Sequence, residues 1–171
     1  YFNDASGLQI LHCITKQCTG GENFLIDGFQ VAKKIKEEHP EVFKRLTTTL
    51  VPAEYIEESR HHKYMAPIIK LHPLTNEIEQ IRFNMYDRAP LNTLPKEKIR
   101  QFYSDLKIIA KELEDPQNRI TFNLEPGTVM VFDNYRILHG RNAFSGKRTM
   151  TGCYVQRTEF LSALRTNGFI E

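Results

Sequence analysis

The chain has 171 residues, of which 40% are hydrophobic and 26% are charged, so its composition allows a packed core and argues against wholesale disorder. The formal net charge of +2 does not indicate a protein that binds nucleic acid or an anionic membrane. No apolar run approaches the ~20 residues needed to span a bilayer. The three cysteines, an odd number, argue against a disulfide framework and for a reducing compartment.

The first part of the chain predicts two strands and two helices. Residues 8–14 have the apolar pattern of a strand, with Leu8, Ile10 and Ile14 on one face. Residues 23–27 predict a second, shorter strand. Asp27 is then placed to cap a helix that reaches Glu38. Pro40 suits the first turn of another helix.

The middle of the chain is less regular until one long helix. Residues 51–66 are polar and lack a period, which predicts irregular structure. Two strand candidates follow, near residues 67–72 and 78–84. Residues 95–113 form the clearest helix of the sequence, because their apolar side chains recur at helical spacing: Ile99, Phe102, Leu106, Ile109 and Leu113.

The last third of the chain predicts more strands. Residues 120–124 alternate between apolar and polar side chains, as a strand with one wet face does. Residues 125–127, Glu-Pro-Gly, predict a type II turn that leads into an apolar strand at 128–132. Another strand is predicted at 149–157, and Thr158 is placed to cap a last short helix.

The order of these elements predicts the fold class. The strands follow one another as antiparallel hairpins, and the helices are segregated between them. That arrangement favours a mainly β sandwich or jelly roll with helices packed outside over a doubly wound parallel sheet.

The densest polar cluster comes directly after the predicted strand at 128–132. It spans residues 133–141 and includes His139, and Arg148 follows nine residues later, across a turn. A neutral His is a good metal ligand, and an Arg inside a barrel offers a two-pronged site for a carboxylate. Together they suggest a metal that also chelates an anionic co-substrate. The alternative reading of the spacing is a surface loop with scattered polar residues.

Residues 132–141, Phe-Asp-Asn-Tyr-Arg-Ile-Leu-His-Gly-Arg, resemble the distal-histidine motif of one family of Fe(II)/2-oxoglutarate oxygenases. This family is the γ-butyrobetaine hydroxylase and trimethyllysine dioxygenase branch. The similarity covers essentially the whole chain. Further matching segments are Leu11-His12-Cys13, Thr19-Gly20-Gly21, Asp27-Gly28-Phe29, Tyr86-Asp87-Arg88-Ala89, Asn92-Thr93 and Gly152-Cys153-Tyr154.

The resemblance implies a double-stranded β-helix, or jelly roll, that is incomplete at its N-terminal edge. Residues 1–171 would then be a single catalytic domain, truncated at its N-terminus. Iron in this family is held by a His-x-Asp pair and a distal His, and His139 matches the distal His. The pair is expected just before residue 1. The formal match His39-Pro40-Glu41 is set aside, because Pro40 has the position of a helix start.

The resemblance also implies how 2-oxoglutarate is bound. Arg148 matches the residue that binds the C5 carboxylate of the co-substrate. Asn23 stands where the family has Thr or Ser, whose hydroxyl contacts a co-substrate carboxylate. The Asn amide can donate a hydrogen bond in its place.

The substrate of this branch carries a trimethylammonium cation, which has no hydrogen to donate and is recognised by aromatic faces. Tyr154 matches a position that walls the cation, although an ordinary cross-strand core tyrosine is the alternative. Asn84 matches a position that holds the polar end of the substrate. Tyr86 and Arg88 lie in the same motif and are expected to assist.

The expected function is therefore hydroxylation of Nε-trimethyllysine at C3, in carnitine biosynthesis, with Fe(II) and 2-oxoglutarate. A γ-butyrobetaine hydroxylase is the close alternative, and a non-catalytic jelly-roll binding module is the alternative of another class. Expected partners are dioxygen and a small trimethylammonium amino acid, without nucleic acid or membrane, and a homodimer stays open. The mitochondrial matrix is the expected location, with the cytoplasm as the alternative.

Overall fold

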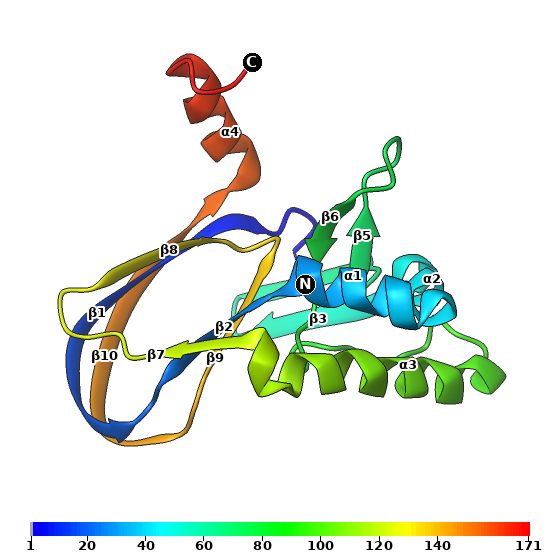
Figure 1. Cartoon of the computed structure of the whole chain (residues 1–171), viewed down its shortest axis with the longest axis horizontal. Helices are drawn as coiled ribbons and strands as arrows, with labels where there is room; N and C mark the ends of the chain where they lie inside the picture. The colour runs from blue at the N-terminus through cyan, green and yellow to red at the C-terminus, as the bar shows by residue number, and fades with distance from the viewer. Residues whose placement is uncertain (1) are drawn as a thin grey trace. The chain divides into compact units, whose positions relative to one another are not determined.

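A computed structural model describes residues 2–171 as two compact units (Figure 1). The first comprises Asp27–Arg119 with Phe2 and Asn3, and we call it the helical unit. The second comprises Asp4–Ile26 and Ile120–Glu171, and we call it the sheet unit. No helix within residues 2–171 is both long enough and apolar enough to cross a membrane.

The helical unit is built on three helices, α1 (Gly28–Glu38), α2 (Pro40–Thr48) and α3 (Lys96–Glu114). The side chain of Asp27 accepts hydrogen bonds from the first backbone amides of α1, which confirms the predicted cap. Each helix buries one apolar stripe, which explains the helical period in the sequence. The buried side chains are Val31, Ala32, Ile35, Val42, Phe43, Leu46, Phe102, Leu106, Ile109 and Leu113.

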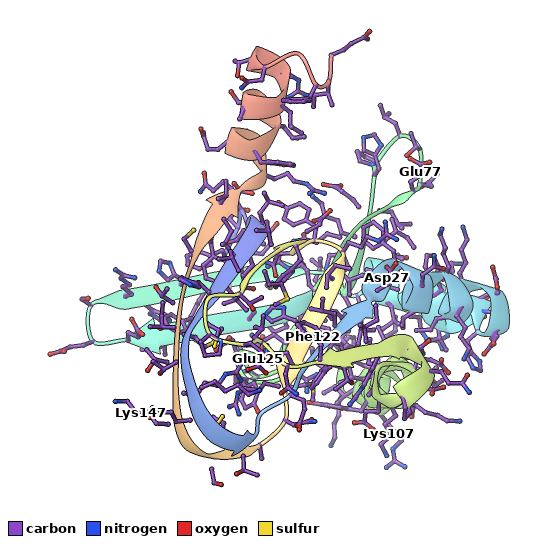
Figure 2. All side chains as sticks on the ribbon, turned by 60° about the vertical axis from the view of Figure 1, so that its left-hand side comes forward. Asp27, Glu77, Lys107, Phe122, Glu125 and Lys147 are labelled. Atoms are coloured by element: carbon purple, nitrogen blue, oxygen red, sulfur yellow. The ribbon has the colours of Figure 1, made fainter. Side chains whose placement is uncertain are left out.

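Two hairpins complete the helical unit. One joins β3 (Val51–Glu57) to β4 (Arg60–Ala66), and the other joins β5 (Ile69–Leu71) to β6 (Ile78–Ile81). Figure 2 shows Glu77 at the far end of the second hairpin, where the turn lies. The prediction of irregular structure over 51–66 was wrong. Most of that hairpin is solvated, so its strands need no apolar alternation to be stable.

The sheet unit contains two three-stranded sheets. In one, β1 (Ser6–Gly20) lies between β10 (Phe144–Gln156) and β8 (Val129–Asp133), and all pairings are antiparallel. Figure 1 shows β1 and β10 as long, bent strands that run side by side. In the other, β2 (Asn23–Asp27) lies between β7 (Arg119–Phe122) and β9 (Ile137–Arg141).

The ends of the sheet unit are only partly as predicted. The Glu-Pro-Gly turn is confirmed: Thr128 donates from its backbone to Glu125 at 3.0 Å, and Gly127 has a φ of 87°, in the left-handed region. The last helix, α4 (Arg157–Thr166), follows β10 without a break. Its N-cap residue is Gln156, without a side-chain cap, so the predicted cap at Thr158 was wrong.

Candidate functional site

Arg148 is held at the start of β10 by polar groups of β2 and the turn before it. One Nη donates to the side-chain oxygen of Asn23 at 2.6 Å, and the other donates to the carbonyl of Gly21 at 3.1 Å. Gly20 and Gly21 have φ values of 77° and 78°, a region that favours glycine and that forms this turn. The guanidinium is therefore fixed on one side by two residues, Gly21 and Asn23, and the sequence analysis had linked Asn23 to the co-substrate.

The other side of this guanidinium has an unused donor. The Nε of Arg148 is buried and has no hydrogen-bond partner among the described residues. A buried donor without a partner is costly, so its natural complement is an acceptor that arrives with a ligand. An Nε–H and an adjacent Nη–H form the parallel pair that a carboxylate accepts. The residues present therefore fit the C5 carboxylate of 2-oxoglutarate.

The register of β10 puts Arg148 and Tyr154 on the same face of the sheet. They are six residues apart in an unbroken strand, so their side chains point to the same side. Gln9 of β1 lies opposite Tyr154 on one side and opposite Phe132 of β8 on the other. Directly opposed residues share a face. Arg148, Tyr154 and Phe132 therefore share one face of the β10-β1-β8 sheet.

His139 joins this face from the other sheet. It lies within β9, and its ring packs against the ring of Phe132 with 4.8 Å between centroids. Burial lowers the pKa of His139, although a hydrogen bond to the Ile137 backbone opposes this shift. A lowered pKa keeps the imidazole neutral near pH 7, and the neutral form is the one that binds a metal.

Two further residues on this face of the β10-β1-β8 sheet were not identified from the sequence. Lys16 lies directly opposite Arg148, and its ammonium group pairs with Glu125 at 2.7 Å. Gln9 is buried, and its side-chain oxygen has no hydrogen-bond partner among residues 2–171. Simple alternation from Cys13 would put Lys16 on the opposite face. A bulge at Ile14 reverses the alternation, and only the observed pairing reveals it.

The described side chains provide fewer ligands for a metal ion than partners for a carboxylate. Within residues 2–171 no three His, Cys, Asp or Glu side chains are grouped so that they could hold a metal ion. His39 and Glu41 belong to the junction of α1 and α2, where Pro40 begins α2 as expected. The described residues thus offer His139 as one neutral imidazole ligand, together with a carboxylate site at Arg148.

Asn84, Tyr86 and Arg88 belong to the helical unit, in the segment after β6. The side chain of Asn84 is engaged in a turn: its oxygen accepts from the backbone amides of Tyr86 at 2.8 Å and Asp87 at 3.4 Å. Its amide nitrogen donates to the Asp87 carboxylate at 2.6 Å. Tyr86 is 97% exposed at the apex of this turn. Asn84 therefore shapes the segment in addition to any contact with a substrate.

Arg88 lies over an aromatic ring in the same unit. Its guanidinium is 5.9 Å from the ring centre of Tyr103. Both residues line a shallow hollow of about 280 Å³, together with apolar side chains that include Met85, Leu91 and Phe102. The hollow therefore has a mostly apolar lining and one positively charged side chain, Arg88.

Known proteins resemble this chain in sequence. It is 38% identical over 172 residues to "Trimethyllysine dioxygenase, mitochondrial" of Rattus norvegicus, covering 98% of this chain and 41% of the rat protein. It is 33% identical over 168 residues to "Gamma-butyrobetaine dioxygenase" of Homo sapiens, covering 93% of this chain and 43% of the human protein. The chain thus spans about two fifths of the length of these relatives.

A solved structure resembles the chain in fold. The crystal structure of AAD-2 in complex with Mn(II) and N-oxalylglycine superposes with a TM-score of 0.68 at 11% identity, covering 88% of this chain and 63% of that one. This likeness confirms the predicted double-stranded β-helix. The family model described as "Taurine catabolism dioxygenase TauD, TfdA family" matches residues 1–154. Because that match spans most of the chain, the protein belongs to the TauD/TfdA dioxygenase family.

Proposed function

We propose that the protein hydroxylates Nε-trimethyllysine at C3, as a step of carnitine biosynthesis, using Fe(II), 2-oxoglutarate and dioxygen. The observation that carries the proposal is the shared face of His139, Arg148 and Tyr154 in the sheet unit. The similarity to trimethyllysine dioxygenases over 98% of the chain supports the choice of substrate.

Arg148 is proposed to bind the C5 carboxylate of 2-oxoglutarate. Its charge is opposite to that of the co-substrate, and its buried Nε has a donor that no described residue satisfies. Asn23 and Gly21 hold the guanidinium from behind, so little side-chain entropy is lost when the ligand binds. Lys16 lies opposite Arg148, but its ammonium group is paired with Glu125, so the charge offered to an anion is that of Arg148.

His139 is proposed to be one iron ligand. Its ring is held by contact with Phe132 and by its backbone hydrogen bond, so the imidazole is oriented before a metal arrives. Bound iron and 2-oxoglutarate would supply the oxidising chemistry, which protein side chains lack. The chain's own part is to bind the co-substrate, orient the amine and shield the reacting carbon from water.

Tyr154 is proposed to form part of the wall around the trimethylammonium group. Tyr154 is 64% exposed in the described chain, which leaves the residue open to a ligand. A quaternary cation desolvated against aromatic rings gains about 2 kcal/mol. Asn84, Tyr86 and Arg88 are proposed to meet the polar end of the substrate.

γ-Butyrobetaine is the second candidate substrate, because the human γ-butyrobetaine dioxygenase is 33% identical over most of this chain. It carries the same cation and would meet the same aromatic wall. A competition assay with equal amounts of both amines and the full-length protein decides between them. Preferential hydroxylation of γ-butyrobetaine would contradict the proposed substrate, whereas turnover of neither amine would contradict the carnitine function altogether.

The proposed location is the mitochondrial matrix, because the names of the trimethyllysine relatives include the word mitochondrial. Fractionation of cells that express the tagged full-length protein tests this location.

A homodimer is the proposed assembly, and sedimentation of the full-length protein decides between monomer and dimer.

A further inference from the structure

Gln9 is a buried polar side chain of the sheet unit to which the proposed reaction gives no role. It is 6% exposed, and its side-chain oxygen has no hydrogen-bond partner within residues 2–171. Because that oxygen is buried, bulk water does not satisfy it as it would satisfy a polar group on an exposed loop. An unpaired buried carbonyl is costly, so its natural complement is a positive group that arrives with a ligand.

The pairing of the strands places Gln9 between two aromatic residues. It lies directly opposite Tyr154 of β10 on one side and Phe132 of β8 on the other, and directly opposed residues share a face. All three residues belong to the sheet unit. The next residues along the same face are uncharged: Leu11, Met130 and Gly152. On these three strands, the amide of Gln9 is therefore flanked by aromatic and apolar groups.

The carboxylate site proposed at Arg148 lies too far along the strand to supply a partner for Gln9. Arg148 and Tyr154 are six residues apart in β10, which is about 20 Å of strand length. Lys16, opposite Arg148, is paired with Glu125. A carboxylate bound at Arg148 therefore leaves the oxygen of Gln9 unpaired. The part of the substrate that comes nearest to Gln9 is the part that Tyr154 is proposed to contact.

A carbonyl oxygen beside an aromatic ring suits a quaternary cation. The positive charge of such a cation is spread over its methyl groups, which attract both the face of a ring and the negative end of an amide dipole. C–H groups also make weak contacts with carbonyl oxygens. No described residue fixes the oxygen of the Gln9 amide, so it is free to turn toward a ligand. A neutral amide also avoids the cost of burying a carboxylate.

We propose that Gln9 is a specificity-determining residue whose side-chain oxygen faces the trimethylammonium group of the substrate, beside Tyr154. This inference rests on the proposed function and deepens it, because it adds a polar group to the wall around the cation. It applies to trimethyllysine and γ-butyrobetaine alike, since both carry the cation. Gln9 selects for charge, because a neutral group of the same shape gains nothing from the oxygen.

The test uses the full-length protein and two compounds, trimethyllysine and the neutral analogue in which carbon replaces the quaternary nitrogen. Anaerobic calorimetry with Fe(II) and 2-oxoglutarate present measures the binding of each compound without turnover. Gln9→Met keeps the length of the side chain and removes the amide, so it should reduce the preference for the cation at least ~threefold. Gln9→Glu should keep or raise that preference, because both protonation states of Glu retain a carbonyl oxygen.

Gln17→Met is the matched control. Gln17 lies on the same strand but is exposed, and it points away from the face that Lys16 shares with Arg148. The control should leave the preference unchanged. An equal weakening of both compounds by Gln9→Met would overturn the proposal, because Gln9 would then serve packing alone. An unchanged preference in Gln9→Met, or an equal loss of preference in Gln9→Glu, would overturn it as well.

The proposed function and the role of Gln9 fail separately. If the wild type hydroxylates neither trimethyllysine nor γ-butyrobetaine, the proposed function fails. A preference for the cation that Gln9→Met reduces still supports the role of Gln9 in that case. Equal binding of the two compounds by the wild type overturns that role, even where trimethyllysine is turned over.

Discussion

Arg148 combines two properties in one side chain. It is anchored through both Nη atoms to Asn23 and Gly21, and it keeps a buried Nε free. Arginine suits this task better than lysine, because its planar fork binds two partners on different edges at once. The departure at Asn23 from the Thr or Ser of the family thus has a use in this chain, as a partner for the arginine.

Replacing Arg148 with Ala in the full-length protein should weaken co-substrate binding selectively. Loss of a buried charged partner costs about 2–5 kcal/mol, which corresponds to a rise of roughly thirtyfold or more in KM for 2-oxoglutarate. The KM for the amine should change much less. Arg141→Ala is the control, because Arg141 donates to a neighbouring backbone carbonyl and lies over Phe144. Equal rises in both KM values would contradict the assignment.

His139→Ala should abolish Fe(II) binding by the full-length protein. Loss of a direct ligand should exceed the ~10–100-fold weakening that follows loss of an outer partner. Titration with Fe(II) under anaerobic conditions measures this, and succinate formation reports turnover. His61→Ala is the control, because His61 is an exposed partner of Glu54 in the β3–β4 hairpin. Normal succinate formation by His139→Ala would remove His139 from the metal site.

At the scale of elements, α2 and α3 are joined by an ion pair between the buried Asp105 and the partly exposed Arg45. Asp105 is only 2% exposed and accepts from Arg45 at 2.7 and 2.9 Å and from Gln101 at 2.9 Å. The hydrogen bond to Asp105 raises the pKa of Arg45. Helical period predicted an apolar face for α3, but it gave no sign that a carboxylate would sit in the middle of that face.

Asp105→Ala should destabilise the protein by about 2–3 kcal/mol. A fully buried pair costs roughly 3–5 kcal/mol to break, and Arg45 keeps part of its hydration. Denaturant unfolding of the full-length protein measures the change in free energy. Lys34→Ala removes the solvated pair with Glu112 that joins α1 to α3, and it should cost much less than Asp105→Ala. A smaller effect for Asp105→Ala than for Lys34→Ala would contradict this ranking.

The approach of β9 to β2 depends on a residue without a side chain. A Cβ placed on Gly140 would lie 2.2 Å from the ring of Phe24, which is far inside contact distance. Gly140→Ala should therefore shift either the ring or β9 and cost about 1–3 kcal/mol. Thermal unfolding measures the loss, and Fe(II) binding should weaken too because His139 precedes Gly140. Ser162→Ala, on the exposed side of α4, is the neutral control. An unchanged melting temperature for Gly140→Ala would contradict the predicted clash.

Sequence patterns identified helices α1, α2 and α3 because burial of one face imposes a period on their residues. Helix α4 was predicted as well, although it buries none of its residues. The hairpin at 51–66 was missed because its cross-strand pairs are largely polar, such as Glu54 with Lys63 and Tyr55 with His62. The bulge at Ile14 was missed because a local change of register leaves no compositional signal.

At the scale of the whole molecule, the sheet unit leaves much apolar surface uncovered. Val129 and Val131 of β8 are more than half exposed, and so is Ile120 of β7. The two valines do not share a face with Tyr154, because Val131 and Phe132 point to opposite sides of β8. Within the described residues, β8 and β10 are also the outer strands of their sheet. Uncovered faces and open edges of this kind favour association.

The 171-residue chain alone should show no decarboxylation of 2-oxoglutarate and should associate in solution. It offers His139 without a group of three metal-binding side chains within residues 2–171, so iron would be held too weakly for turnover. Light scattering after size exclusion should report a mass above the 20.0 kDa of the monomer. Val131→Lys on the exposed side of β8 should reduce association, because a charge on an outer strand disfavours pairing. Iron-dependent turnover by a soluble monomer would contradict both expectations and would direct attention to His39 and Glu41 as the missing ligands.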